Sequence, residues 1–394
     1  MNERKTALEI LRKTMSSSSY SNLLMRSHLN SDDNIGFITN LVYGVLENYD
    51  SLKYQLNGLY KKTSKVNEII MVMSLYERFI LKKEIYVSIN EYVKLADNEY
   101  DKSFINAVLH KIMYFKEPDE PHIKYNLSKW IYKLLSKQYP EYDLSLILNN
   151  LSRKKQVYYH INHNKTDFNS LKHLNIDIIN DDFFTCKDSL LKTEEFYNGL
   201  FYVQDINSAK IVDSLDLQEN DLFLDACSAP GSKLFNALKY IKQENAYSND
   251  VNINRVKLIN EKAQILGFDR VNYSAYDARE LSEYIDIKFD KILLDVPCSG
   301  LGVISRKPDI KFHITDSSLD ELQDIQKDIL DNASSLLKEY GLLCYSTCTL
   351  NRKENSVQID KFLKKHKEFV RVKEETITDP RGDMFYYCLI KHNK

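Results

Sequence analysis

The sequence of 394 residues lacks several features that would place it in a specialised class of protein. No run of eighteen apolar residues occurs, so we expect no membrane-spanning helix and no membrane partner. The first five residues, Met1 to Lys5, contain no apolar signal core, and a cytoplasmic location is the expectation. Six cysteines in so long a chain do not form a disulfide framework. Neither the cysteines nor the nine histidines show the paired spacing of a metal site, so no metal is expected.

A surplus of basic residues is also missing. The 54 Lys and Arg residues are nearly balanced by 56 Asp and Glu, and the net charge is −2. Since phosphate neutralisation supplies much of the affinity of nucleic-acid binders, any basic surface here must be local. Charge alone does not predict RNA binding. The length predicts two or three domains, and we expect a monomer.

The hydrophobic pattern divides the chain into three parts. Residues 1–145 are predicted to be all helical, because apolar residues recur at spacings of three and four, as at Ile38, Leu41, Val42 and Val45. Residues 146–215 contain short alternating runs and are predicted to form a small α+β segment. From residue 216 to 394 apolar runs alternate with helical stretches, which is typical of βαβ units and a parallel sheet.

The last part is therefore predicted to be an α/β, Rossmann-like domain with a mostly parallel sheet. Its expected strands are Leu222–Asp225, Ala246–Asp250, Val271–Ala275, Phe289–Asp295 and Leu342–Ser346. Its expected helices are 231–242, 252–266, 319–338 and 352–366. Glu368–Val372 and Met384–Ile390 are expected to add a late antiparallel hairpin.

Glycine is scarce, with ten in the whole chain, and one of them marks a candidate binding loop. The loop follows the first predicted strand of the α/β domain and leads into a helix, at the edge where such sheets bind ligands. It lacks the G-x-G-x-x-G pattern, which argues against a hydride-transferring enzyme. Asp250 and Asp277 end the next two strands and are candidates to bind a ribose and an adenine. The candidate loop residues are Cys227, Ser228, Ala229, Pro230, Gly231, Ser232 and Lys233.

Two cysteines carry the chemistry that the sequence indicates. Cys298 follows Asp295, Val296 and Pro297, and Cys348 follows a Tyr-Ser-Thr run; each stands after an apolar run that predicts a strand. Carbon 5 of cytosine is a poor nucleophile until a thiolate adds to carbon 6, and a second base must later remove the carbon 5 proton. The candidate binding loop of residues 227–233, called the donor loop from here on, offers a nearby site for a methyl donor. Together with it, the pair of thiols predicts a pyrimidine methyltransferase.

These motifs resemble the Sun/RsmB-type RNA cytosine-5 methyltransferases. The resemblance rests on Asp225–Lys233, Asp295–Ser299, Arg306–Lys311 and Tyr345–Cys348. It extends to the helical part, where Asn40–Leu46 and Phe104–Leu109 are similar to the NusB-like domain of that family.

The resemblance implies S-adenosylmethionine as methyl donor and small-subunit ribosomal RNA as substrate. It also implies that Cys348 is the nucleophile and that Cys298 releases the product. Our mechanistic hypothesis adds that Asp295 contacts both the methyl donor and the target cytosine, and that it binds the N3 and amino edge of the cytosine. Lys233 is our candidate for the positive charge that lowers the pKa of Cys348.

Two positions depart from the family's pattern. Ser232 stands where the donor loop usually has a second glycine, and Leu301 stands where a small or hydroxylic residue is usual. Neither change touches a reacting atom. Arg306, Lys307 and Lys311 lie beside the Pro-Cys motif, and we predict that they contact RNA phosphates.

Two other functions stay open. The same chemistry could act on transfer RNA, because the motifs do not encode the target. Alternatively, the chain could be an RNA-binding ribosome assembly factor whose donor site has decayed, as Ser232 and the weak basic character suggest.

Overall fold

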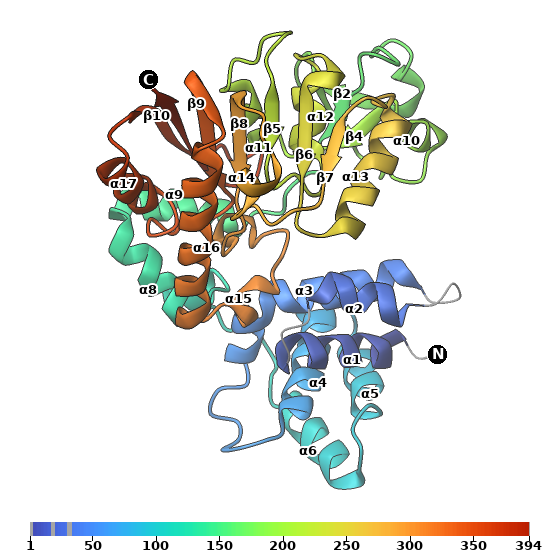
Figure 1. Ribbon diagram of the computed structural model, residues 1–394. Coiled ribbons are helices and arrows are strands. Elements are labelled where there is room, and N and C mark those ends of the chain that lie inside the picture. The colour runs from blue at the N-terminus through green and yellow to red at the C-terminus, as the bar shows by residue number, and fades with distance from the viewer. Residues whose placement is uncertain (1–2, 17–19, 30–33, 394) are drawn as a thin grey trace. The chain divides into compact units, whose positions relative to one another are not determined.

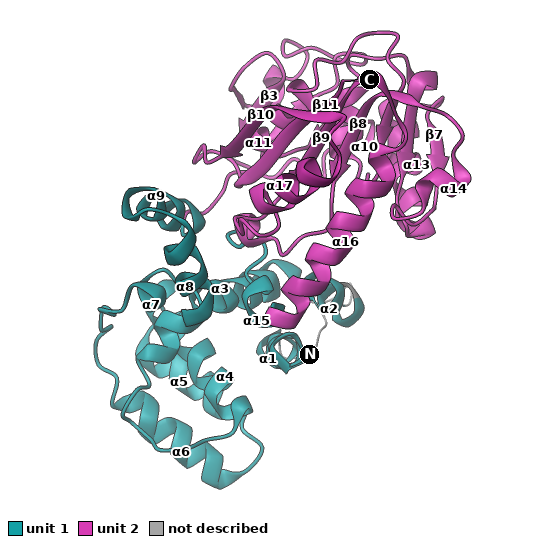
Figure 2. Cartoon of the chain, turned by 60° about the vertical axis from the view of Figure 1, so that its left-hand side comes forward, with its two compact units in different colours: residues 1–152, 304–315 teal, residues 153–303, 316–394 magenta. Residues whose placement is uncertain are grey.

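The computed structural model describes residues 3–16, 20–29 and 34–393, which form two compact units (Figure 2). The helical unit comprises residues 1–152 and 304–315, and the sheet unit comprises residues 153–303 and 316–394. Met1 and Asn2, which belong to the predicted helical part, lie outside the described residues. None of the helices in the described ranges has an apolar stretch of the length that a membrane crossing requires.

The helical unit has the predicted all-α architecture. The apolar spacing on α3 (Ile35–Tyr54) places Ile38, Leu41, Val42 and Val45 on one face, where all four are fully buried. A π-helical turn, Tyr76–Ile80, extends α4. The remaining helices of residues 1–152 are α1 (Glu3–Ser16), α2 (Ser21–His28), α4 (Lys65–Leu75), α5 (Ile85–Val93), α6 (Glu99–His110), α7 (Pro121–Lys124), α8 (Lys129–Gln138) and α9 (Glu141–Leu151).

A short excursion of the later chain completes this unit. Residues 304–315, with helix α15 (Ile310–His313), pack with the helices although the sequence pattern assigned them to the α/β domain. Asp309 accepts hydrogen bonds from the backbone N–H and the hydroxyl of Ser21, and Phe312 packs against the helical core. The helical unit also continues to residue 152 instead of 145.

The sheet unit begins with a small antiparallel sheet in the order β2-β3-β1-β4. It belongs to the segment predicted as α+β, and it is part of the same compact unit as the larger sheet. Its elements are β1 (Tyr159–Ile161), β2 (Ile176–Ile178), β3 (Phe183–Cys186), α10 (Glu194–Tyr197) and β4 (Phe201–Val203), with a 3-10 turn at Lys172–Leu174.

The main sheet has seven strands in the order β10-β11-β9-β8-β5-β6-β7 (Figure 1). Strands β5 to β9 are parallel, and β10 and β11 form the antiparallel hairpin that the sequence predicted. The strands are β5 (Phe223–Asp225), β6 (Ala246–Asn249), β7 (Asn272–Ser274), β8 (Phe289–Asp295), β9 (Leu337–Thr347), β10 (Phe369–Ile377) and β11 (Phe385–His392).

Helices cover both faces of this sheet because successive strand residues point to opposite sides. Phe223 and Leu293 pack with α11, α12 and α13, whereas Leu224 and Leu294 pack with α14, α16 and α17. The helices are α11 (Ile206–Asp213), α12 (Ser232–Ala237), α13 (Ile253–Leu266), α14 (Leu281–Tyr284), α16 (Asp316–Ser334) and α17 (Ser356–Lys365), with 3-10 turns at Gln243–Asn245 and Leu301–Val303.

Candidate active site

The candidate site lies at the carboxyl ends of the parallel strands. The chain runs outward from β5 to β7 in one direction and from β8 to β9 in the other, so the strand order reverses between β5 and β8. Open α/β sheets bind ligands at such a reversal. Asp225 ends β5, Asp295 ends β8, and Thr347 ends β9 immediately before Cys348.

The structure brings the two motif cysteines together. The Sγ atoms of Cys298 and Cys348 are 3.4 Å apart although the residues are 50 positions apart in the chain. Both side chains are half-buried, and all six cysteines are free thiols. By contrast Cys344 and Cys388 are fully buried in the core.

The proximity of the two sulfurs couples the ionisation of one thiol to that of the other. The pKa of Cys298 is raised well above its ordinary value by its hydrogen bond with Cys348, then by burial and by the charges of Cys348 and Glu354. Two thiolates at this distance repel each other, so only one of the pair carries the charge at a time. Cys348 as the charged member of the pair stays a prediction.

The buried Lys233 forms an ion pair with the half-buried Asp295. Lys233 Nζ donates to Asp295 Oδ2 at 2.7 Å, and Ser346 Oγ donates to Asp295 Oδ1 at 3.1 Å. Burial opposes the charge on Lys233, but Asp295, Cys348 and Asp225 together raise its pKa above the ordinary value. The charged form of Lys233 is therefore favoured and interacts electrostatically with Cys348, and its predicted effect on the pKa of Cys348 stays a prediction.

The donor loop is closely packed around Gly231. This glycine has φ +97°, and a Cβ there would lie 2.8 Å from Phe235 Cζ. Its N–H donates to Ser228 O at 2.7 Å, and Ser228 N–H donates to Asn249 O at 2.8 Å. Ser232 is the first residue of α12 and has no positive φ, so the missing second glycine does not strain the loop. The loop includes the other predicted positions Cys227, Ala229 and Pro230.

The two predicted strand-end carboxylates differ in their partners. Asp250 is buried and accepts the N–H of Asn252 through Oδ1 at 2.9 Å. Asp277 is half-exposed, and Arg279 engages both of its oxygens, which lowers the pKa of Asp277. The ribose contact of Asp250 and the adenine contact of Asp277 stay predictions; in this arrangement Arg279 competes for the carboxylate of Asp277.

Sequence reasoning missed Asn249, which joins the ends of three strands. Its amide nitrogen donates to Ala226 O and Tyr276 O, and its oxygen accepts from Tyr276 N–H and Ser274 Oγ. All four hydrogen-bonding positions of the amide are used, so Asn249 fixes the loops around the donor site. Its place at the end of a strand, directly before Asp250, was the available signal.

A second residue that the sequence did not single out is Asp225. Its carboxylate is buried, and neither oxygen makes a hydrogen bond of ordinary geometry with the described residues. Burial and the charge of Asp295 raise the pKa of Asp225 to about 7, although Lys233, Ser228 and the N–H of Cys227 act in the opposite direction. Apart from weak contacts with each other and with the N–H of Cys227, the Asp225 carboxylate and the buried Ser228 hydroxyl have no hydrogen-bond partner among the described residues, so both are available to a ligand in the loop.

The three basic residues predicted to contact RNA belong to the helical unit, whereas the two thiols belong to the sheet unit. The side chain of Lys311 is only 2% exposed, and Nζ donates to Asp50 Oδ2 at 2.9 Å and Asn126 O at 2.8 Å. Its predicted contact with phosphates does not fit this burial, because α15 inserts the lysine into the helical core. Lys307 is exposed and Arg306 half-buried, and their RNA contacts stay predictions.

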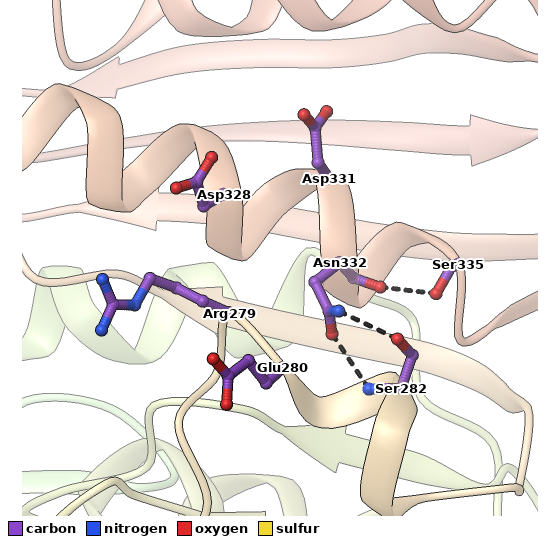
Figure 3. Close-up of a pocket in the computed structure, with 7 residues that line it drawn as sticks. All are labelled: Arg279, Glu280, Ser282, Asp328, Asp331, Asn332 and Ser335. Atoms are coloured by element: carbon purple, nitrogen blue, oxygen red, sulfur yellow. Dashed lines mark hydrogen bonds between the residues drawn. The ribbon is translucent and has the colours of Figure 1, made fainter.

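A surface cleft of about 600 Å³ lies elsewhere, between α14 and α16 (Figure 3). Across the cleft, Asn332 Oδ1 accepts a hydrogen bond from the N–H of Ser282, and Asn332 Nδ2 donates one to the Ser282 hydroxyl. These hydrogen bonds connect the two helices. The cleft contains neither thiol nor any residue of the donor loop. Its lining residues are Arg279, Glu280, Ser282, Asp328, Asp331, Asn332 and Ser335.

Comparison with known proteins identifies the family. The family described as "16S rRNA methyltransferase RsmB/F" matches this sequence over residues 212–385, and the family described as "NusB family" matches it over residues 1–114. A probable ribosomal RNA small subunit methyltransferase B of Bacillus subtilis is 33% identical over 93% of this chain and 89% of its own length. The chain belongs to the RsmB/F methyltransferase family. The family resemblance drawn from the motifs is thereby confirmed.

Other relatives support the same family and fold. The ribosomal RNA small subunit methyltransferase B of Yersinia enterocolitica is 27% identical over 92% of this chain and 91% of its own length. The crystal structure of NSun6 from Pyrococcus horikoshii with SFG has a TM-score of 0.60 at 18% identity. It covers 68% of this chain and 98% of that protein. The Rossmann-like fold and the NusB domain are confirmed.

As a member of this family, the chain uses S-adenosylmethionine as its methyl donor. The donor loop fits such a ligand, because Gly231 leaves space that a Cβ would fill and Ser228 and Asp225 present buried polar atoms without partners. Asp250 and Asp277 are at the ends of the next strands, within the same edge of the sheet.

Proposed function

We propose that this methyltransferase transfers a methyl group to carbon 5 of a cytosine in small-subunit ribosomal RNA through a covalent adduct with Cys348. The observation that carries the proposal is the 3.4 Å separation of two thiols at the carboxyl edge of the sheet. Methylation at a nucleophilic nitrogen or oxygen needs no second thiol. Carbon 5 of cytosine needs one sulfur to activate the ring and one base to remove a proton.

The first half of the reaction belongs to Cys348. Its thiolate attacks carbon 6 of the cytosine, a C–S bond forms, and the electron pair of the C5–C6 double bond becomes available at carbon 5. Lys233 stabilises the thiolate before attack, and Asp295, held by Lys233 and Ser346, is positioned to bind the N3 and amino edge of the base. S-adenosylmethionine, when bound, would supply the methyl group that carbon 5 takes, and its sulfonium would leave as the thioether S-adenosylhomocysteine.

The second half belongs to Cys298. Once the negative charge of Cys348 has been used in the C–S bond, the electrostatic effect of that charge on Cys298 is removed. Cys298 then loses its proton to water and, as a thiolate, takes the proton from carbon 5. The C5–H electrons restore the double bond, the C6–S bond breaks, and Cys348 leaves as a thiolate.

The ribosomal substrate is supported by the curated relatives, whose names specify the small subunit of the ribosome. Transfer RNA is the second candidate for the same chemistry, because nothing at the thiol pair encodes the target. Bisulfite sequencing of ribosomal and transfer RNA from a deletion strain separates the two. An unmethylated cytosine in small-subunit RNA alone is expected; loss only in transfer RNA would contradict the proposed substrate.

The two thiols give the test of mechanism. Replacing Cys348 with Ala is expected to abolish both methylation and the covalent protein–RNA adduct, because no sulfur adds to carbon 6. Replacing Cys298 with Ala is expected to trap the adduct, because the proton on carbon 5 stays. Adducts are measured as bands stable to denaturing gel electrophoresis. Methylation by the Cys348→Ala protein would end the proposal.

The assembly-factor alternative makes a different prediction about the donor. A chain with a decayed donor site would bind RNA but not S-adenosylmethionine. Calorimetric titration with S-adenosylmethionine distinguishes the two functions, and we expect binding because the loop around Gly231 is intact and Ser232 causes no strain.

A further inference from the structure

The mechanism does not use two neighbouring buried residues, Glu354 and Asn355, which lie just before α17. Each bonds the loop that carries one of the two thiols. They stand six and seven positions after Cys348, in the polar run that follows the Thr-Cys motif.

Glu354 holds the loop of Cys298. Its carboxylate is fully buried, and Oε2 accepts the backbone N–H of Ser299 at 2.8 Å while Oε1 accepts the hydroxyl of Ser299 at 2.6 Å. Gln326 Nε2 donates to Glu354 Oε2 at 3.0 Å and to Pro297 O at 2.9 Å. Both neighbours of Cys298 in the chain are therefore fixed by one hydrogen-bonded group centred on Glu354.

Asn355 holds the loop of Cys348. Its side-chain oxygen accepts the hydroxyl of Thr347 at 2.6 Å, and its nitrogen donates to Thr349 O at 2.9 Å. Both neighbours of Cys348 are therefore bonded to one amide. The two groups meet where the hydroxyls of Ser299 and Thr349 are 2.7 Å apart, and Asn351 links them as well, since its N–H donates to Thr349 Oγ1 and its amide nitrogen to Glu354 Oε1.

The charge of Glu354 needs an explanation beyond packing. Among the residues that the structure describes, no Lys, Arg or His forms an ion pair with it, and its partners are N–H and hydroxyl donors. Burying a carboxylate without a cation is unfavourable unless every oxygen is hydrogen-bonded, and here four donors meet the two oxygens. Four donors aimed at one carboxylate restrict the Ser299 backbone more narrowly than a neutral side chain would.

We propose that Glu354 is a positioning residue for Cys298 and that Asn355 is a positioning residue for Cys348. The inference rests on the proposed function. It assigns the second half of the reaction, proton removal, to the positioning by Glu354 and the first half, attack on carbon 6, to the positioning by Asn355. Disturbing Glu354 then slows removal of the carbon 5 proton, whereas disturbing Asn355 slows the attack on carbon 6.

The first test is Glu354→Gln, which keeps the shape of the side chain and removes one acceptor and the charge. The amide oxygen can still accept the Ser299 N–H, but the amide nitrogen meets donors and the Cys298 loop loosens. The adduct is expected to form at close to the wild-type rate and to resolve up to about 100-fold more slowly, so that it accumulates in single-turnover reactions.

The second test is Asn355→Ala, with Thr347→Val as a milder variant that removes only the hydroxyl of the same hydrogen bond. Both are expected to slow adduct formation without adduct accumulation, Asn355→Ala more than Thr347→Val. If Glu354→Gln fails to fold in circular-dichroism melts, Ser299→Ala removes the hydroxyl contacts with Glu354 and Thr349 but keeps the backbone N–H bond to Glu354, and it is expected to slow resolution to a smaller extent.

The cysteine variants separate failure of the inference from failure of the proposed function. If Cys298→Ala accumulates no adduct, the proposed function fails. If Cys298→Ala accumulates adduct but the Glu354 variant resolves it at the wild-type rate, the positioning role is overturned. Equal slowing of formation and resolution in both the Glu354 and Asn355 variants also overturns it, because it indicates general structural damage.

Discussion

At the scale of single residues, the site combines charges that would be unfavourable one by one. Asp225, Lys233 and Asp295 are arranged so that the lysine neutralises one carboxylate and leaves the other unpartnered. The raised pKa of Asp225 is a direct result, since burial and the Asp295 charge both favour its protonated form.

This shift predicts a dependence of stability on pH. Since the pKa of Asp225 rises from 3.8 to about 7 on folding, the folded chain holds a proton that the unfolded chain loses. The contribution of Asp225 to stability is therefore greatest below about pH 4 and is lost as the pH rises through about 7, by up to about 3 kcal/mol between pH 5 and pH 8. Asp225→Asn is expected to remove this component.

The measurement is the apparent Tm without donor at both pH values, for the wild type and for Asp225→Asn. The wild type is expected to lose more Tm on going to pH 8 than the variant. Parallel losses in the two proteins would show that Asp225 is ionised in the folded state.

A second residue-scale prediction concerns the donor loop. Gly231→Ala places a Cβ against Phe235 and forces an L side chain into the left-handed region, which costs about 1–2 kcal/mol before any clash. We expect at least about tenfold weaker binding of S-adenosylmethionine in calorimetry.

The matched control is Ser232→Gly, the adjacent position. Ser232 has ordinary helical backbone, so a glycine there should change the affinity by less than about threefold. Tighter binding by a factor of ten or more would mean that Ser232 does limit the donor site.

At the scale of elements, the short helix α15 gives Lys311 a different role from the RNA contact predicted for the basic residues of Arg306–Lys311. Lys311 and Asp309 anchor the segment 304–315 to the helical unit through Asp50 and Ser21. Burial lowers the pKa of Lys311, while Asp50 favours its charged form. The lysine therefore has a structural role in the helical unit.

Lys311→Ala is expected to destabilise the protein by about 2–3 kcal/mol, because it leaves the carboxylate of Asp50 and the carbonyl of Asn126 without their donor. Lys307→Ala, at an exposed position of the same segment, should change stability by less than about 0.5 kcal/mol. Thermal melts of the two variants make the comparison.

For RNA binding, the larger effect is expected at Lys307 and the smaller one at Lys311, the reverse of their effects on stability. Lys307→Glu is expected to weaken binding and to reduce the slope of log affinity against log salt by about one or two, whereas Lys311→Met should leave the slope unchanged. Filter binding at several salt concentrations measures both. A reduced slope in the Lys311 variant would restore its predicted phosphate contact.

At the scale of the whole molecule, the chain passes through the helical unit twice. Residues 304–315 lie in it, although both flanking segments belong to the sheet unit. The helical unit is thus built from parts separated by about 150 residues of chain, which makes its folding depend on the later segment.

Replacing residues 304–315 with a Gly/Ser linker of equal length tests this dependence. The helical unit loses the Asp309 and Lys311 anchors and the Phe312 contact, so its thermal transition is expected to move to lower temperature. The donor site lies in the sheet unit, and calorimetric binding of S-adenosylmethionine should persist. Unchanged melting would show that the segment is dispensable to the helical unit.

Local chemistry explains how much of this could be read from the sequence. Strand β8 was predicted with its exact bounds of Phe289–Asp295, since a buried parallel strand is a continuous apolar run with a polar residue at its end. Strand β9 begins five residues earlier than predicted, at Leu337, because Tyr340 takes a positive φ within a turn-like stretch that sequence periodicity does not reveal.

The sequence by itself determined the fold class, the donor loop and the two cysteine motifs, because apolar period, glycine position and residue type are properties of short segments. Only the tertiary structure decided that the two thiols lie in contact, that Glu354 and Asn355 bond their flanking residues, and that Lys311 is buried. Each of these depends on contacts between distant segments, whose partners are set by packing and by the need to satisfy buried polar groups.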